Sequence, residues 1–475
     1  MNIRPMKRIL LILVSMLAAI SVYAQHNHRT GYFLDGYTYK YKINPAFGAD
    51  RGYFAIPVAG FTSAALETPL QLSSLLYPTG NNGELVTFLH PSVSLDDVMK
   101  GVKSMNPINV NADLSILSFG FNTKKSFHTL DLSVKADARL NVPGAVFLWA
   151  KESSDALDMS KLGLNADARL ELSYGYSRAI RKNARFGFRI KLLAGLAKAQ
   201  YQMDNLQLAA AQDKWTVQST GSGYYAAPIP LITEGYDHRI TGVDLPEDYY
   251  EIIDNVVAAR NLGAAIDLGF SIDVLKYMTI SASVTDLGVM TWNNGYMLGS
   301  PESYWTYDGF EGIGNEDMNW NEQLEMLGEE LLDIIYPRVT SEGEKKLDML
   351  SMTAHLGVEL RMPFWQRLSV GALASARFDG PYSWYEGRAS VNCALFRWFS
   401  FSGSYAYSTY GESYGAALNF HPKGLNLFVG LDSFKPLMNV TRQYVPIDSF
   451  NTNATVGLNI AFGQYRGRYT KKAKR

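Results

Sequence analysis

Residues 130–142, LDLSVKADARLNV, decide the fold, because apolar and polar residues alternate through the whole stretch. Every even position from Leu130 to Val142 is apolar, and every odd position between them is polar or charged. Successive side chains of a β-strand point to opposite faces, so the pattern predicts a strand with one dry face and one wet face. The wet face carries Lys135, Asp137 and Arg139, which are too polar for a dry core.

The same alternation recurs at 164–177, 262–272, 278–284, 350–362, 368–378, 389–395, 425–431 and 454–462. These runs reach about 9 to 13 residues, whereas a strand of a soluble protein usually has about five or six. A tilted strand that crosses a bilayer needs about 9 to 11. We therefore predict about fourteen strands, with twelve or sixteen as alternatives, since single-chain bacterial barrels favour even numbers.

The connections between these segments differ sharply in length. Links such as 274–277, 363–367 and 421–424 are short, whereas those near 203–260 and 293–347 are long and polar. Periodicity alone would also allow a soluble sandwich. Short turns at one end and long loops at the other are typical of an outer-membrane barrel. The predicted fold class is therefore all-β: a transmembrane antiparallel outer-membrane β-barrel with a short helical N-terminal segment and long extracellular loops.

The two ends of the chain predict its location. Residues 1–24 combine Arg4, Lys7 and Arg8 with an apolar run, as in a signal peptide, so we expect export to the cell outer membrane. Residues 25–107 form an N-terminal segment, interpreted as a lumen plug or cap with a first strand. Residues 108–463 form the barrel. Residues 464–475 form a basic periplasmic tail, which is either solvated or in contact with lipid or a partner.

Composition excludes several classes of protein. The 475 residues contain 44 basic and 45 acidic side chains, 47% apolar residues and a single cysteine, Cys393. A nearly neutral chain is no nucleic-acid-coating protein, and one cysteine supports neither a disulfide scaffold nor a multi-cysteine zinc site. His26 and His28 make only a weak metal site near a chain end. We expect no metal, no cofactor and no nucleic-acid partner.

Charged residues on the wet faces are the candidate lumen-lining residues. Two interpretations remain open: a cross-strand ladder of alternating charges that fills the barrel, or a path for a polar solute. The candidates are Asp137, Arg139, Asp167, Arg169, Glu171, Arg189, Lys191, Asp267, Glu359 and Arg361.

Several segments resemble a known family. They are the Asn44-Pro45-Ala46 element, the strand 130–143, Tyr174-Gly175-Tyr176-Ser177, FGFRIKLLAG at 186–195, AAIDLG at 264–269 and VTDLGVMTW at 284–292. In this order they resemble an uncharacterised Bacteroidetes outer-membrane barrel family, a domain of unknown function that is distantly similar to FadL-type fatty-acid transporters. The resemblance implies location and fold and covers most of residues 40–463. It brings no established substrate and no catalytic residues.

Three functions follow as hypotheses. The first is a FadL-like passive transporter of a hydrophobic or amphipathic small molecule, which requires an apolar pocket in the barrel mouth. The second is a structural or interaction barrel with an envelope or secretion partner. The third is a lipid hydrolase built on Ser413, whose Gly411-Glu-Ser-Tyr-Gly415 pattern lacks the following helix that a nucleophile elbow needs. We favour the first, expect no enzyme, and expect outer-membrane lipid as a partner.

Overall fold

The computed structural model describes residues 28–70, 74–78, 85–151, 157–210, 215–236, 238–244, 254, 258–307, 337–434 and 451–464. The expected signal peptide and residues 465–475 of the expected basic tail lie outside this part of the chain. None of the helices in the described ranges is long and apolar enough to cross a membrane.

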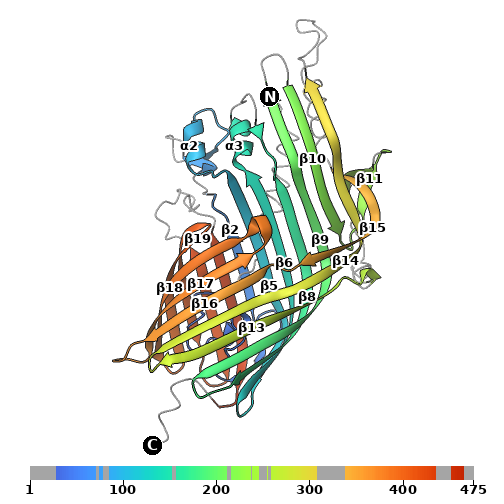
Figure 1. Cartoon of the computed structure of the whole chain (residues 1–475). Helices are drawn as coiled ribbons and strands as arrows, with labels where there is room; N and C mark the ends of the chain where they lie inside the picture. Colours follow the sequence, from blue (N-terminus) through green and yellow to red (C-terminus); the bar gives the residue numbers. More distant parts are fainter. Residues whose placement is uncertain are drawn as a thin grey trace, which may run out of the picture.

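The described strands close into an antiparallel barrel of 14 positions, which confirms the predicted fold (Figure 1). Each wall strand pairs with the wall strands before and after it in the sequence, and the last strand, β22, pairs with β1 and β2. The strands of the wall are β1 (Gly52–Ala55), β2 (Thr62–Glu67), β5 (Met105–Asn122), β6 (Ser126–Pro143), β8 (Gly163–Ala179), β9 (Ala184–Ala210), β13 (Leu262–Leu275), β14 (Met278–Tyr307), β16 (Met352–Arg361), β17 (Leu368–Phe378), β18 (Trp384–Phe396), β19 (Phe399–Ser408), β20 (Gly411–Phe420), β21 (Leu425–Phe434) and β22 (Thr452–Phe462).

The first wall position is interrupted. β1 and β2 occupy it one above the other, and both lie between β22 and β5. Ala55 pairs with Asn459, and Thr62 pairs with Val456. Between these two pairs the chain advances seven residues from β1 to β2 but only three residues along β22. The surplus residues form a bulge that carries Val58 at a positive φ of 65°. We call the contact of β1 and β2 with β22 the closing seam.

One side of the barrel is much taller than the other. β9 has 27 residues and β14 has 30, whereas β16, β19, β20 and β21 have 10 each. Above the end of β13, strand β10 (Trp215–Ala226) fits between β9 and β14, and β15 (Arg338–Met349) continues the sheet (Figure 1). Much of the sequence expected as long loops near 203–260 and 293–347 is therefore strand, where it is described.

Smaller elements lie above the wall or beside it. Helix α2 (Leu95–Lys100) begins at Ser94, whose side chain accepts a hydrogen bond from the Asp97 amide. Helices α2 and α3 lie at the upper end in Figure 1, the end opposite the short turns. The remaining elements are α3 (Gly144–Lys151), β3 (Leu76–Pro78), β4 (Leu85–Thr87), β7 (Leu157–Asp158), β11 (Leu231–Glu234), β12 (Arg239–Val243), η1 (Thr38–Lys42) and η3 (Gly380–Tyr382).

Burial in the wall is the reverse of burial in a soluble protein. Leu130 is 43% exposed, whereas its neighbour Asp131 is 1% exposed. The same inversion holds at Leu172 and Glu171, which are 42% and 1% exposed. The apolar faces of the strands thus form an outer belt and the polar faces turn inward, as a barrel in lipid requires.

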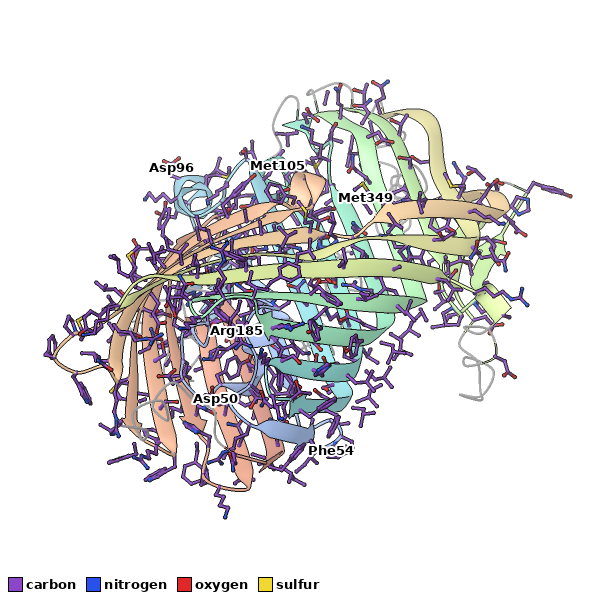
Figure 2. All side chains as sticks on the ribbon, turned by 60° about the horizontal axis from the view of Figure 1, so that its bottom comes forward. Asp50, Phe54, Asp96, Met105, Arg185 and Met349 are labelled. Atoms are coloured by element: carbon purple, nitrogen blue, oxygen red, sulfur yellow. The ribbon has the colours of Figure 1, made fainter. Side chains whose placement is uncertain are left out.

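Residues 28–50 fill the lower part of the barrel, and we call them the plug. Figure 2, turned so that the lower end comes forward, has Asp50 inside the ring of strands. The plug carries Tyr37, Tyr39 and Tyr41, each at most 2% exposed, into a cluster with Phe61 and Phe428 of the wall region. The interior is therefore aromatic beside part of the plug and ionic elsewhere.

Candidate functional site

The ten candidate lumen-lining residues all lie on inward faces of the wall. Glu171, Arg189, Lys191 and Asp267 are at most 3% exposed, and Asp137, Arg139, Arg169 and Glu359 are also buried. Asp167 and Arg361 are half-buried. Glu359 and Arg361 pair with each other at 3.2 Å near the lower end. The other eight fall into two groups of ion pairs.

The first group, the Arg189 cluster, joins β6, β8, β9, β13 and β14. Arg189 Nη1 lies 3.1 Å from Asp267, and its Nη2 lies 3.3 Å from Asp131. Lys191 Nζ lies 2.8 Å from Asp267, and Lys135 Nζ lies 2.8 Å from Glu171. Buried charges are tolerated when they are paired and hydrogen-bonded in this way.

Asp286 is a member of the Arg189 cluster that the sequence analysis missed. It lies 2.6 Å from Lys191 Nζ, and its amide donates a hydrogen bond to Asp267 at 2.7 Å. The register of β13 and β14 shifts between Ile266 and Leu268, and Asp286 has a positive φ of 59°. Such a bulge turns a side chain of the outward register into the lumen. The signal was present in the sequence, because an aspartate in the apolar register would otherwise face lipid.

The second group, the Asp137 cluster, lies further up the lumen. Asp137 is 3.0 Å from Arg169 and 3.4 Å from Arg377, and Asp379 is 2.9 Å from Arg139. With Asp167, which contacts Arg169 at 2.5 Å, the cluster holds three cations and three anions. This charge balance matches the ladder interpretation, in which the lumen has ionic side chains without a net field.

A third group, the Asp432 cluster, anchors the start of the plug. Both Asp432 carboxylate oxygens accept backbone hydrogen bonds, from Arg29 N at 2.5 Å and from Thr30 N at 2.7 Å. The Arg29 side chain lies 2.9 Å from Glu67 and 3.2 Å from Glu386. The plug is therefore tied to β2, β18 and β21 at once. The sequence analysis missed this cluster, because interpreting residues 25–107 as a lumen plug or cap does not say which wall residues the segment contacts.

The Asn44-Pro45-Ala46 element of the plug docks on two glycines of the wall. A Cβ at Gly187 would lie 2.0 Å from the Pro45 carbonyl oxygen, and one at Gly269 would lie 2.2 Å from the Asn44 side-chain oxygen. Only glycine permits so close an approach of two backbones. Both glycines belong to segments that carry the family resemblance. Those segments thus meet the Asn44-Pro45-Ala46 element in space.

Three cavities follow the lumen from top to bottom. The upper cavity, of about 170 Å³, is lined by the apolar residues Met290, Trp292, Met349 and Leu350 and by ionic residues, among them Arg139, Lys198 and Lys346. The middle cavity, of about 60 Å³, shares Arg169 and Ser351 with it and reaches Arg29 of the plug. The lower cavity, of about 530 Å³, begins at Tyr32 and Phe33. The plug thus separates the middle cavity from the lower one.

A further hollow of about 780 Å³ is not part of the lumen path. It lies over outward-facing residues of β16 to β19, such as Leu356, Ala374 and Gly387. These residues belong to the outer belt, so the hollow faces the surroundings of the barrel.

The residues considered for catalysis and metal binding are placed elsewhere. Ser413 lies inside β20 and is 4% exposed, so the strand, turn and helix of a nucleophile elbow are not formed around it. His28 lies 3.1 Å from Asp432 as part of the plug anchor, and His26 lies outside the described residues. Among the described residues, no group of three or more His, Cys, Asp or Glu side chains could hold a metal ion.

Comparison with solved structures returns barrel proteins. The toluene transporter TodX of P. putida matches 89% of this chain and 93% of its own, at 9% identity and a TM-score of 0.41. A FadL homologue of Pseudomonas aeruginosa matches 93% of this chain and 100% of its own, at 10% identity and a TM-score of 0.42. The translocator domain of the autotransporter NalP from Neisseria meningitidis matches at 7% identity, covering 88% of this chain and 90% of its own, with a TM-score of 0.32. No curated protein matches the sequence.

A family model gives a more direct assignment. The model of a family of unknown function, DUF5723, matches residues 45–432. The match begins at Pro45, in the element that docks on Gly187 and Gly269, and ends at Asp432, which anchors the plug. It spans most of the barrel wall, and it confirms the resemblance to an uncharacterised barrel family. The chain therefore belongs to the family of unknown function DUF5723.

Proposed function

We propose that this protein is an outer-membrane transporter for a small amphipathic acid. The observation that carries the proposal is the upper cavity, whose lining combines apolar and ionic side chains. Trp292 and Met290, both at most 2% exposed, belong to its apolar lining. Its ionic lining has four cations, Arg139, Arg169, Lys198 and Lys346, against three anions, Asp167, Asp348 and Asp379, a surplus of one cation. A molecule with an apolar body and one anionic group matches this mixed lining.

The size of the upper cavity limits the ligand. Water occupies about 30 Å³ per molecule in the liquid, so about 170 Å³ corresponds to roughly five or six waters. That volume suits a short or aromatic acid better than a long acyl chain. The cations of the cavity already have partners, for example Lys198 with Asp348 at 3.0 Å. An entering acid would exchange these partners, and a neutral hydrocarbon would gain nothing from them.

Passage requires the plug to move. The middle and lower cavities lie on opposite sides of it, with Arg29 facing one and Phe33 the other. We propose that the described arrangement is the closed state, and that release of the plug joins the cavities. The same proposal includes export by a signal peptide and an outer-membrane location. In it, the upper ends of β9, β10, β14 and β15 lie outside the cell. Export and the outer-membrane location are supported by the N-terminal sequence and by the outer apolar belt.

The test uses phenylbutyrate as the probe acid and phenylbutanol as its neutral analogue. Binding is measured by calorimetry on the refolded barrel, and uptake is measured in proteoliposomes. We expect phenylbutyrate to bind more tightly than phenylbutanol. Trp292→Ala and Lys346→Gln should each weaken acid binding about tenfold, which corresponds to about 1.4 kcal/mol.

Matched controls are Trp398→Ala and Lys276→Gln, since both residues are exposed at the lower end and line neither the upper nor the middle cavity. Equal binding of acid and alcohol, or equal losses in the controls, would contradict the proposal. If neither binding nor uptake is found, the structural or interaction barrel replaces transport as the better function.

A further inference from the structure

The lower cavity has a composition that the proposed transport does not explain. Its floor is the underside of the plug, where Tyr32, Phe33 and Phe47 pack edge to face at ring distances of 4.7 and 5.2 Å. Phe33 belongs to a buried cluster with Ile43 and Leu373, whereas Phe47 is only partly buried. The floor therefore offers a firm aromatic surface at the inner end of a cavity of about 530 Å³.

The rim of this cavity is strongly basic. Lys124 and Lys125 come from the turn between β5 and β6, and Arg181 and Lys182 come from the turn between β8 and β9. All four side chains are exposed. With Lys40, Arg185 and Arg361, the lining contains seven cations against four anions, Asp35, Asp50, Asp273 and Glu359.

Three of the four anions have partners within the wall or the plug. Asp273 accepts a hydrogen bond from Thr279 at 2.6 Å, Glu359 pairs with Arg361 at 3.2 Å, and Asp50 accepts the Gly36 amide at 3.2 Å. These three carboxylates thus have partners other than the four turn cations. The rim consequently presents a positive potential at the open end of the cavity.

Arg185 connects the rim to the plug. Its Nε donates to the Ala46 carbonyl at 3.0 Å, and its Nη2 donates to Ser177 Oγ at 2.9 Å. Ser177 Oγ donates to the same carbonyl at 2.7 Å. Figure 2 labels Arg185 inside the ring of strands near Asp50. A guanidinium held by two partners lies between the aromatic floor and the lysine rim, so the cavity is cationic along its depth as well as at its edge.

We propose that the lower cavity binds an amphipathic anion, with its apolar part on Phe33 and Phe47 and its carboxylate or phosphate among Lys124, Lys125, Arg181 and Lys182. The site goes beyond the proposed transport and does not rest on it, because none of these residues lines the upper or middle cavity. The same chemistry has two sources: a free acid at the lower end, or a phospholipid of the leaflet around that end. Both have an acyl or aromatic body and one anionic group.

The test measures laurate binding to the full-length barrel in phosphatidylcholine nanodiscs, with dodecanol as the uncharged analogue. We expect laurate to bind, and the combined change Lys124→Gln, Lys125→Gln, Arg181→Gln and Lys182→Gln to weaken it by about tenfold or more, since charged contacts contribute strongly to anion binding. Dodecanol binding should stay unchanged in this variant. Phe47→Ser should weaken both ligands, because it removes aromatic surface that both share.

The matched control replaces three other lower-end cations, Lys276→Gln, Arg397→Gln and Lys423→Gln, which are exposed and do not line the cavity. A control loss as large as that of the rim variant would overturn the proposal, as would equal binding of laurate and dodecanol in the unmodified protein. Displacement of laurate by phosphatidylglycerol in the nanodisc identifies a leaflet lipid as the occupant. Retention of laurate identifies a free acid.

A last experiment distinguishes binding at the lower cavity from binding at the upper cavity of the proposed transporter. The Trp292→Ala and Lys346→Gln barrel should still bind laurate at the lower cavity with unchanged affinity. If that barrel loses laurate while the rim variant retains it, the ligand occupies the upper cavity and the lower site is excluded.

Discussion

His421 lies in the turn after β20 and has an environment that favours its neutral ring. Burial and the nearby Arg51 cation lower its pKa from 6.5 to about 4. The ring packs so closely on Gly36 that a Cβ there would lie 2.6 Å from it. A lowered pKa means that the unfolded chain binds the proton more tightly than the folded one.

This residue makes stability depend on pH in a defined window. As pH falls from about 6.5 to about 4, the free energy of unfolding should decrease by up to roughly 3 kcal/mol from this group alone, because each pKa unit corresponds to about 1.4 kcal/mol. Urea unfolding of the barrel across this window measures the decrease. His421→Gln should flatten it, whereas His90→Gln, at an exposed position, should leave it as steep. An equally steep slope in His421→Gln would contradict the assignment.

At the scale of elements, the plug depends on two close backbone contacts with β9 and β13. A side chain at Gly187 or Gly269 would collide with Pro45 or Asn44. We expect Gly187→Val and Gly269→Val to displace the plug and to raise ion conductance in planar bilayers. Gly403→Val is the control, because nothing lies within 4 Å of a Cβ at that position. Conductance that stays at the level of the unmodified protein in both variants would show that the plug does not close the lumen.

The wall strands could be predicted from the sequence, and residues 25–107 could be interpreted as a lumen plug or cap, but the contacts that the plug makes could not be predicted, for a physical reason. The alternation of Leu130 to Val142 arises because one face of the strand is apolar and outward and the other contacts ionic side chains. This difference between the faces can be detected in the sequence. The plug is buried on all sides and has no period to detect. Its tyrosines cannot be recognised as buried from the sequence, because their partners Phe61 and Phe428 are distant in the chain. At Asp286 the sequence shows an aspartate in the apolar register but not the bulge that turns it inward, since a register shift breaks the pattern that assigns its face.

At the scale of the whole molecule, the proposed membrane location makes lipid the solvent of the outer surface. Val134 lies in the outward register near the middle of β6, next to the buried Lys135. Val134→Arg should lower the free energy of unfolding in vesicles by about 2 to 4 kcal/mol, the cost of an arginine near the midplane on the lipid face of a barrel. Val243→Arg, at an exposed apolar position in β12, which lies beside β15 and outside the wall, should change it by less than about 0.5 kcal/mol. Equal effects at both positions would contradict the outward belt.

The closing seam leads to an expectation about the order in which the molecule is assembled. β2 pairs with β22 across almost the whole chain, with Ser63 opposite Thr455, whereas most other neighbours in the wall are close in sequence. Contacts between such distant residues form late, because the intervening chain must be ordered first. The plug immediately precedes the seam, and Asp432, its anchor, lies in the strand immediately before β22. We therefore expect the plug to reach its anchor in the same late step that pairs β22 with β1 and β2, so that the barrel closes with the plug already inside it.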